Sequence, residues 1–136
     1  MTVVCKQSVD QSTEEKTDTL SKEDEIIICA SCFNHITDPG RQIIVNNSFH
    51  HTFANPHGYV FEIGCFSTAR GCRPGSISSN EFSWFIGYSW KIGVCNYCST
   101  HLGWIFSSDT NGLRVTFRSR GTNNFFGLIL EKLIFP

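Results

Sequence analysis

Short apolar runs alternate with turn-forming residues along most of this chain. The runs that predict β-strands are 42–45, 59–63, 89–94, 103–106 and 113–117, and the last apolar segment, 125–134, predicts a closing strand. The turn signals between them are Asp38-Pro39-Gly40, Asn55-Pro56-His57-Gly58, Arg73-Pro74-Gly75 and Asp109-Thr110-Asn111-Gly112. No segment keeps an apolar period of about 3.6 residues, so helices should be short or absent. The pattern therefore predicts an all-β domain.

The N-terminal segment has a different composition from the rest of the chain. Residues 6–25 are rich in Gln, Ser, Thr, Glu, Lys and Asp. They offer too few apolar side chains to offset the entropy of ordering, so we expect residues 1–25 to form a disordered acidic tail. Residues 26–136 are expected to form one domain, which begins at the apolar run Ile26-Ile27-Ile28.

The formal charge is divided unevenly between these two parts. Residues 1–25 carry seven acids and three bases, a net charge of −4, and residues 26–136 carry five acids and eight bases, a net charge of +3. A charge of +3 is too small to indicate a nucleic-acid partner. No run approaches the roughly 18 apolar residues of a membrane helix. We therefore expect neither a nucleic-acid partner nor a membrane partner.

Two Cys-x-x-Cys pairs, Cys29/Cys32 and Cys95/Cys98, are separated by 62 residues. Four thiolates at paired spacing are typical of a tetrahedral Zn²⁺ site, and four protein ligands leave no open coordination position. We therefore expect one structural zinc ion. Redox-active pairs or two disulfides are the alternatives, and the repetition of the pair favours zinc. His101, three residues after Cys98, is expected to pack beside the metal site without binding the ion.

Cys65 and Cys72 are separated by six residues and have two interpretations. A loop of this length can be closed by a disulfide in an oxidising compartment, or both residues can be buried thiols in a reduced protein. The N-terminus lacks the apolar core of a signal peptide, whereas the sequon Asn46-Asn47-Ser48 is consistent with secretion. A cytoplasmic protein and a processed secreted form both remain open.

All three tryptophans, Trp84, Trp90 and Trp104, fall within 21 residues around the second cysteine pair. Small β domains often pack tryptophan in the core, but indole faces also suit flat apolar ligands and cations. Backbone groups at the start of this segment can hydrogen-bond the edge of a planar amide. The clustering beside the expected zinc site favours a ligand pocket on a metal-stabilised β scaffold.

Several stretches of the chain closely resemble the CULT domain family, the cereblon-type thalidomide-binding domains. These stretches are Ile28-Cys29-Ala30-Ser31-Cys32, Asn55-Pro56-His57-Gly58-Tyr59-Val60-Phe61-Glu62, Glu81-Phe82-Ser83-Trp84-Phe85, Gly87-Tyr88-Ser89-Trp90, 95–104 and Phe125-Phe126-Gly127-Leu128. The resemblance covers about residues 26–136. Vertebrate members have His in place of Phe82, and members commonly have Pro in place of Ile86. In these details the chain is more similar to CULT-only relatives from bacteria and secreted eukaryotic proteins.

The resemblance implies a β-tent, in which two antiparallel sheets meet near a structural zinc site with four cysteine ligands. It also implies a non-enzymatic module that holds cyclic imides in a cage of three tryptophans. The ligands would be the glutarimide ring of thalidomide-type drugs, uridine-like rings, or cyclic imides at protein C-termini. Trp84, Trp90 and Trp104 would form the walls and Phe106 the floor.

The resemblance assigns further ligand contacts to backbone groups and to the rim of the cage. The carbonyl of Phe82 and the N–H of Trp84, on either side of Ser83, would bond the imide. Asn55 and Pro56 would lie at the rim. The Lon-like domain that docks the ubiquitin-ligase adaptor in this family has no counterpart here, so we expect no adaptor site in this chain, and we expect a monomer.

Two other functions are alternatives. Oxidoreductases of the methionine sulfoxide reductase type share a zinc-knuckle β fold, but their catalytic cysteine follows the second pair, and this chain has no cysteine after Cys98. An RNA-binding zinc domain would use the basic run Arg114, Arg118 and Arg120. That run is more simply the solvated face of a hairpin.

Overall fold

The computed structural model describes residues 25–108 and 124–136. The predicted all-β class is confirmed, since these residues contain β-strands and two short 3₁₀ helices but no α-helix. None of their helices is long and apolar enough to cross a membrane. The strands are β1 (Ile27–Cys29), β2 (His35–Thr37), β3 (His50–Ala54), β4 (Val60–Phe66), β5 (Cys72–Pro74), β6 (Tyr88–Cys95), β7 (His101–Ser108), β8 (Asn124–Ile129) and β9 (Leu133–Ile134), and the 3₁₀ helices are η1 (Pro39–Arg41) and η2 (Leu130–Lys132).

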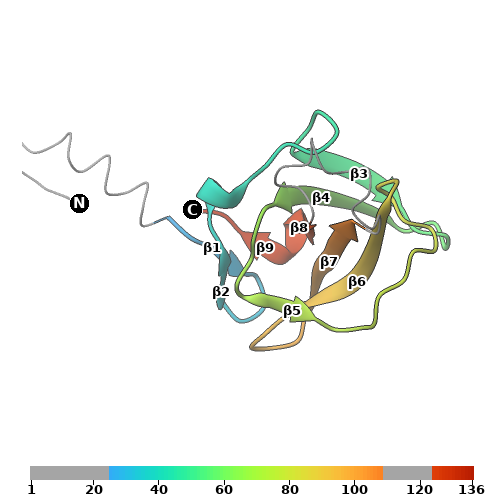
Figure 1. Cartoon of the computed structure of the whole chain (residues 1–136). Helices are drawn as coiled ribbons and strands as arrows, with labels where there is room; N and C mark the ends of the chain where they lie inside the picture. Colours follow the sequence, from blue (N-terminus) through green and yellow to red (C-terminus); the bar gives the residue numbers. More distant parts are fainter. Residues whose placement is uncertain (1–24, 109–123) are drawn as a thin grey trace, which may run out of the picture.

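The strands form two antiparallel sheets, as the predicted fold requires. The larger sheet has the order β3-β4-β8-β7-β6-β5, and the smaller has the order β2-β1-β9. Figure 1 shows the small sheet beside the C-terminus and the β3–β4 hairpin at the far side of the large sheet. The C-terminal segment joins both sheets, because β8 lies in the large sheet and β9, after η2, pairs with β1.

Two groups of buried side chains fill the interior. One group lies around the cysteine pairs and includes Ile27, Ile36, Phe66, Leu102 and Leu128. The other is largely aromatic and packs beneath the tryptophans: Ile63, Cys65, Phe85, Phe106, Phe125 and Ile129. The rings of this second group meet mainly edge to face, a preferred arrangement for aromatic pairs. It therefore gives the tryptophans a packed base.

Three predicted elements are wrong, and two of them have a local reason. Residues 42–45 form only isolated bridges, because the short segment is confined between η1 and a tight turn at Asn46 and Asn47, where φ is positive. The predicted loop at Arg73-Pro74-Gly75 instead begins within β5. Pro74 is tolerated there because β5 is an edge strand, where a backbone N–H need not pair.

The predicted strand 125–134 corresponds to two strands in different sheets, divided by η2. The predicted strand 113–117 and the turn at Asp109–Gly112 lie outside the described residues. So does nearly all of the tail predicted over residues 1–25.

Cys65 and Cys72 are buried free thiols. Cys72 packs in the group around the cysteine pairs, and Cys65 packs in the aromatic group. Burial raises the pKa of both thiols to about 12. Both are therefore neutral near pH 7, and of the two interpretations the structure has the buried thiols.

Candidate functional site

The structure brings the two cysteine pairs together. The four Sγ atoms of Cys29, Cys32, Cys95 and Cys98 all lie within 4.8 Å of one another. The Sγ atoms of Cys29 and Cys98 are 3.7 Å apart, and those of Cys32 and Cys95 are also 3.7 Å apart. A tetrahedron with Zn–S bonds of about 2.3 Å has edges of about 3.8 Å. The cluster therefore has the donor type, number and spacing that suit a zinc ion.

The first cysteine loop is folded to present its sulfurs inward. The backbone N–H of Phe33 donates to the carbonyl of Cys29 at 2.8 Å, and Phe33 adopts a positive φ of 67° to close the turn. The N–H of Ser31 points at the Cys29 Sγ, 3.4 Å away. Such an N–H stabilises a thiolate more than a thiol, because it donates to negative charge.

The second loop repeats this arrangement. The N–H of Ser99 donates to the carbonyl of Cys95 at 2.9 Å, with a φ of 66° at Ser99, and the N–H of Tyr97 lies 3.4 Å from the Cys95 Sγ. Hydrogen bonds from the side chain and backbone of Thr100 lower the pKa of Cys98 to about 6. Four thiolates this close repel one another unless a cation lies between them. The two loops thus form a matched pair of turns whose sulfurs could hold a metal ion.

His101 is not one of the clustered ligands. Its Nε2 lies 3.0 Å from the carbonyl oxygen of Gly103, and its ring meets Trp104 edge to face at 5.0 Å. Burial lowers the pKa of His101, and the charge of Lys132 lowers it further. A neutral imidazole that packs against the tryptophan agrees with the predicted packing role.

A cavity of about 800 Å³ opens on the face of the large sheet that carries the tryptophans. The β6–β7 register places Trp90 opposite Phe106 and Ile92 opposite Trp104. Cross-strand partners share a face, and so do residues two apart on a strand. These four side chains therefore form one continuous surface, and all four line the cavity.

Trp84 forms a second wall from the connection between β5 and β6. Its ring centroid lies 4.7 Å from that of Trp104, with an interplanar angle of 72°. Its indole N–H donates to the carbonyl of Ala54 at 3.1 Å, whereas that of Trp90 donates to the carbonyl of Glu81 at 2.9 Å. Because both indole N–H groups are used within the protein, these two side chains offer the cavity mainly apolar ring surface.

The segment before Trp84 supplies polar backbone groups. Neither the carbonyl of Phe82 nor the N–H of Trp84 bonds another residue in the described part of the chain. Phe82 has a φ of 56° and lines the cavity. Ser83 is not among the lining residues, since its hydroxyl is bonded to the backbone of Phe85. Of the predicted ligand residues, Ser83 alone is absent from the lining.

The predicted rim residues lie at the tip of the β3–β4 hairpin, and both line the cavity. The side-chain oxygen of Asn55 accepts hydrogen bonds from the backbone N–H groups of His57 and Tyr59, each at 3.0 Å. Asn55 therefore shapes the turn that carries Pro56. Asn commonly stabilises turns in this way, by accepting hydrogen bonds from backbone N–H groups a few residues later in the chain.

Sequence reasoning missed six of the lining residues, namely His57, Phe61, Ser79, Glu81, Ile92 and His101. Ile92 could have been found, because it follows Trp90 by two residues in a strand. His57 belongs to a motif that was already identified. Phe61 belongs to the same motif, whereas Ser79 lies outside every quoted stretch and reaches the cavity only through the tertiary arrangement.

The comparisons with known proteins agree with the fold and the motifs. No protein-family model matches the chain. The chain is 33% identical over 82 residues to protein cereblon of Gallus gallus, a match that covers 60% of this chain and 17% of cereblon. It is 43% identical over 56 residues to cereblon of Danio rerio, covering 41% of this chain and 13% of that protein.

The longer match to cereblon of Drosophila virilis is 29% identical over 120 residues and covers 85% of this chain and 19% of that protein. The chain thus spans less than a fifth of the length of these three relatives. The predicted resemblance is confirmed: the chain is similar to part of cereblon from several species, and a CULT domain fits these matches.

Proposed function

We propose that this chain is a non-enzymatic binding module that holds cyclic imides in the cavity between Trp84, Trp90 and Trp104. The observation that carries the proposal is an aromatic enclosure with unpaired backbone groups at its wall. A planar imide presents apolar faces to the indoles. Its N–H can donate to the Phe82 carbonyl, and a ring carbonyl can accept from the Trp84 N–H. The glutarimide of thalidomide-type drugs, a uridine-like ring and a C-terminal cyclic imide of a protein share this edge.

The buried floor supports the same proposal. Phe106 is only 1% exposed, and it stacks on Phe125 at a centroid distance of 5.1 Å. A rigid apolar floor excludes water from the ring and strengthens hydrogen bonds at its edge. Phe106 would limit how deep the ring can enter, and Asn55 and Pro56 would contact whatever the ring carries.

We assign zinc to the cysteine cluster as a structural ion. A bound zinc ion would supply a fixed tetrahedral crosslink between the two cysteine loops. No described residue beyond the four cysteines belongs to the cluster. The chain also lacks a cysteine after Cys98, so the oxidoreductase alternative gains no support. Residues 26–136 are the proposed extent of the domain, and the basic run at Arg114, Arg118 and Arg120 lies outside the described residues.

Titration with glutarimide, followed by intrinsic tryptophan fluorescence and calorimetry, tests the proposal. We expect saturable binding, and we expect Trp84→Ala to weaken it by about tenfold or more, because an aromatic contact of about 1.4 kcal/mol corresponds to that factor. N-methylglutarimide is the matched ligand control, since it keeps the ring but lacks the imide N–H. Equal affinity for both ligands would refute imide recognition. So would the absence of binding at about 1 mM glutarimide, since this concentration is high enough to detect a Kd in the millimolar range.

A further inference from the structure

Phe53 supports the ligand cavity from outside it. Its ring stacks on Trp84 with a centroid distance of 4.8 Å and an interplanar angle of 10°. Trp84 lines the cavity, whereas Phe53 is not among the lining residues. An effect of Phe53 on a ligand in the cavity would therefore be indirect. Phe53 also meets Phe85 edge to face at 5.3 Å, and Phe85 meets Phe106, but the parallel stack acts on Trp84, which lines the cavity itself.

Phe53 is paired across the hairpin with a residue that touches two of the tryptophans. Phe61 lies directly opposite Phe53 in the β3–β4 register. The Phe61 ring lies 6.1 Å from Trp84 and 5.1 Å from Trp104, by ring centroids. The pair Phe53/Phe61 thus contacts tryptophans from two different elements, the β5–β6 connection and β7. The hairpin fixes these tryptophans relative to each other.

A hydrogen bond holds Trp84 to the same strand. The Cys65 N–H donates to the Phe49 carbonyl, and the Asn55 N–H donates to the Tyr59 carbonyl. The odd-numbered residues of β3 therefore pair with β4, and the even-numbered residues direct their backbone groups to the open edge. The carbonyl of Ala54 is one of these outward groups, and it accepts the Trp84 indole N–H. The ring stack restricts the tilt of the indole, and the hydrogen bond restricts its rotation in the plane.

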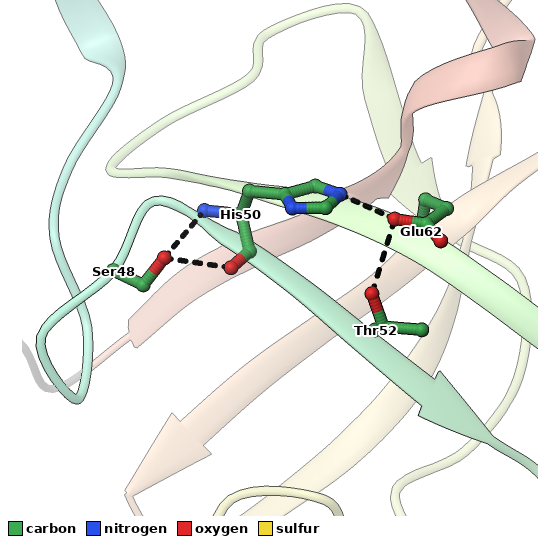
Figure 2. A network of polar contacts seen from close by, with 4 residues as sticks. All are labelled: Ser48, His50, Thr52 and Glu62. Carbon is green, nitrogen blue, oxygen red and sulfur yellow. Dashed lines mark hydrogen bonds and ion pairs between the residues drawn. The ribbon is translucent and has the colours of Figure 1, made fainter.

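Polar contacts on the opposite face hold the hairpin in register. Figure 2 shows Glu62 of β4 reaching both His50 and Thr52 of β3. Ser48 bonds both the N–H and the carbonyl of His50, at 3.2 and 2.7 Å. Residues 50 and 52 alternate with Phe53, so their side chains lie on the other face of the strand. Phe53 is thereby kept opposite Phe61 without contacts inside the cavity.

We propose that Phe53 is a positioning residue, which with the Ala54 carbonyl holds Trp84 at the angle that forms a wall against Trp104. The expected change in ligand affinity rests on the proposed imide binding. The expected change at the Trp84 indole in the ligand-free protein does not depend on that proposal.

Phe53→Leu removes the stacked ring, and Phe49→Leu is the matched control. Phe49 is half-buried and on the same side of the hairpin, but its ring packs on Phe66 at 5.5 Å and contacts no tryptophan among the described rings. Phe53→Tyr keeps a stacking ring and tests rescue. Phe53→Met, which keeps most of the volume without a ring, repeats the test if Phe53→Leu does not fold.

The readouts are the hydrogen-exchange rate of the Trp84 indole Nε1–H in the ligand-free full chain and the Kd for glutarimide. We expect Phe53→Leu to raise the exchange rate, because an indole that is free to tilt opens its hydrogen bond to the Ala54 carbonyl more often. We expect it also to raise Kd by about three- to tenfold, the factor that corresponds to losing the aromatic pair with Trp84. Phe53→Tyr should keep both values near those of the wild type. Phe49→Leu should lower the melting temperature and leave both values unchanged.

An unchanged exchange rate of the Trp84 indole N–H in both Phe53→Leu and Phe53→Met would overturn the inference. So would an equal loss of affinity in Phe49→Leu, since that result would indicate a general loss of stability. If the wild-type chain binds no glutarimide, the proposed function fails, and the exchange rate of the Trp84 indole N–H alone then decides whether Phe53 positions the indole.

Discussion

At the scale of single residues, Phe82 combines two uncommon features at the cavity. The residue is 73% exposed, and its φ of 56° is a conformation that bulky residues rarely adopt. Backbone strain of this kind persists where the surrounding structure enforces it, often at binding sites. The conformation leaves the Phe82 carbonyl unbonded at the wall, so the backbone of this residue, more than its ring, would determine imide recognition.

Substitutions at Phe82 can distinguish the contribution of its backbone conformation to ligand affinity from that of its ring. Phe82→Ala should keep the affinity for glutarimide within about twofold, as expected for an exposed side chain outside the main contacts. Phe82→Pro should abolish binding, because proline fixes φ near about −65° and cannot adopt the positive value. Phe82→Gly, which tolerates positive φ, is the control and should bind. Calorimetry measures all three, and a loss in Phe82→Ala as large as in Phe82→Pro would assign recognition to the ring.

At the scale of elements, the sheet depends on close backbone approach where β7 passes β8. Gly103 has a φ of +155°, and a Cβ added there would lie 2.1 Å from the carbonyl oxygen of Gly127. That oxygen belongs to the backbone of β8, which cannot move aside without disturbing the strand. Gly103 also precedes Trp104, so a shift here would reach the cavity wall.

Gly103→Ala is therefore expected to destabilise the fold by about 3 kcal/mol or more, the upper range for overpacking a filled interior. Gly58→Ala is the control. Gly58 also has a positive φ, +92°, but nothing lies within 4 Å of its added Cβ. Gly58→Ala should therefore lower the free energy of unfolding by only about 1 to 2 kcal/mol, the cost of the strained conformation. Urea unfolding of both variants measures the difference, and equal costs would contradict the steric argument.

Local pattern predicted some elements and not others for identifiable reasons. The strands around Trp90 and Trp104 were predictable because they are long and end near recognisable cysteine turns. β3 (His50–Ala54) was missed, because its two histidines and alternating exposure give a weak apolar pattern and its order comes from pairing with β4. The break at η2 was not visible either, because residues 125–134 are mostly apolar and their division between two sheets is a tertiary effect.

The candidate site was predictable from motifs more than from periodicity. Trp84, Trp90, Trp104 and Phe106, which the resemblance places in a ligand cage, line one cavity, and ligand binding there stays a prediction. The stacking of Phe53 on Trp84 was not predicted, because Phe53 lies in a strand with a weak apolar pattern and the two residues are 31 positions apart in the sequence. Such contacts follow from sheet order, which short-range sequence signals do not specify.

At the scale of the whole molecule, the cysteine cluster joins the two sheets. β1 of the small sheet ends at Cys29, and β6 of the large sheet ends at Cys95. β6 also carries Trp90, and β7, which leaves the second cysteine loop, carries Trp104. A metal ion in the cluster would therefore fix the strands that bear two cavity walls, although it would not touch the ligand.

Removal of the metal should consequently weaken ligand binding through the fold. The chain is expected to contain one zinc ion per molecule, and chelation should remove a folding contribution on the order of 10 kcal/mol. Cys95→Ala should lose zinc, thermal stability and glutarimide affinity together. Cys65→Ala is the matched control, because Cys65 is equally buried but lies in the aromatic group, so it should retain zinc. Zinc analysis, thermal melting and calorimetry on the same samples decide the matter. Unchanged affinity in zinc-free protein would show that the cavity walls keep their places without the metal, and the link between the cluster and the cage would then be wrong.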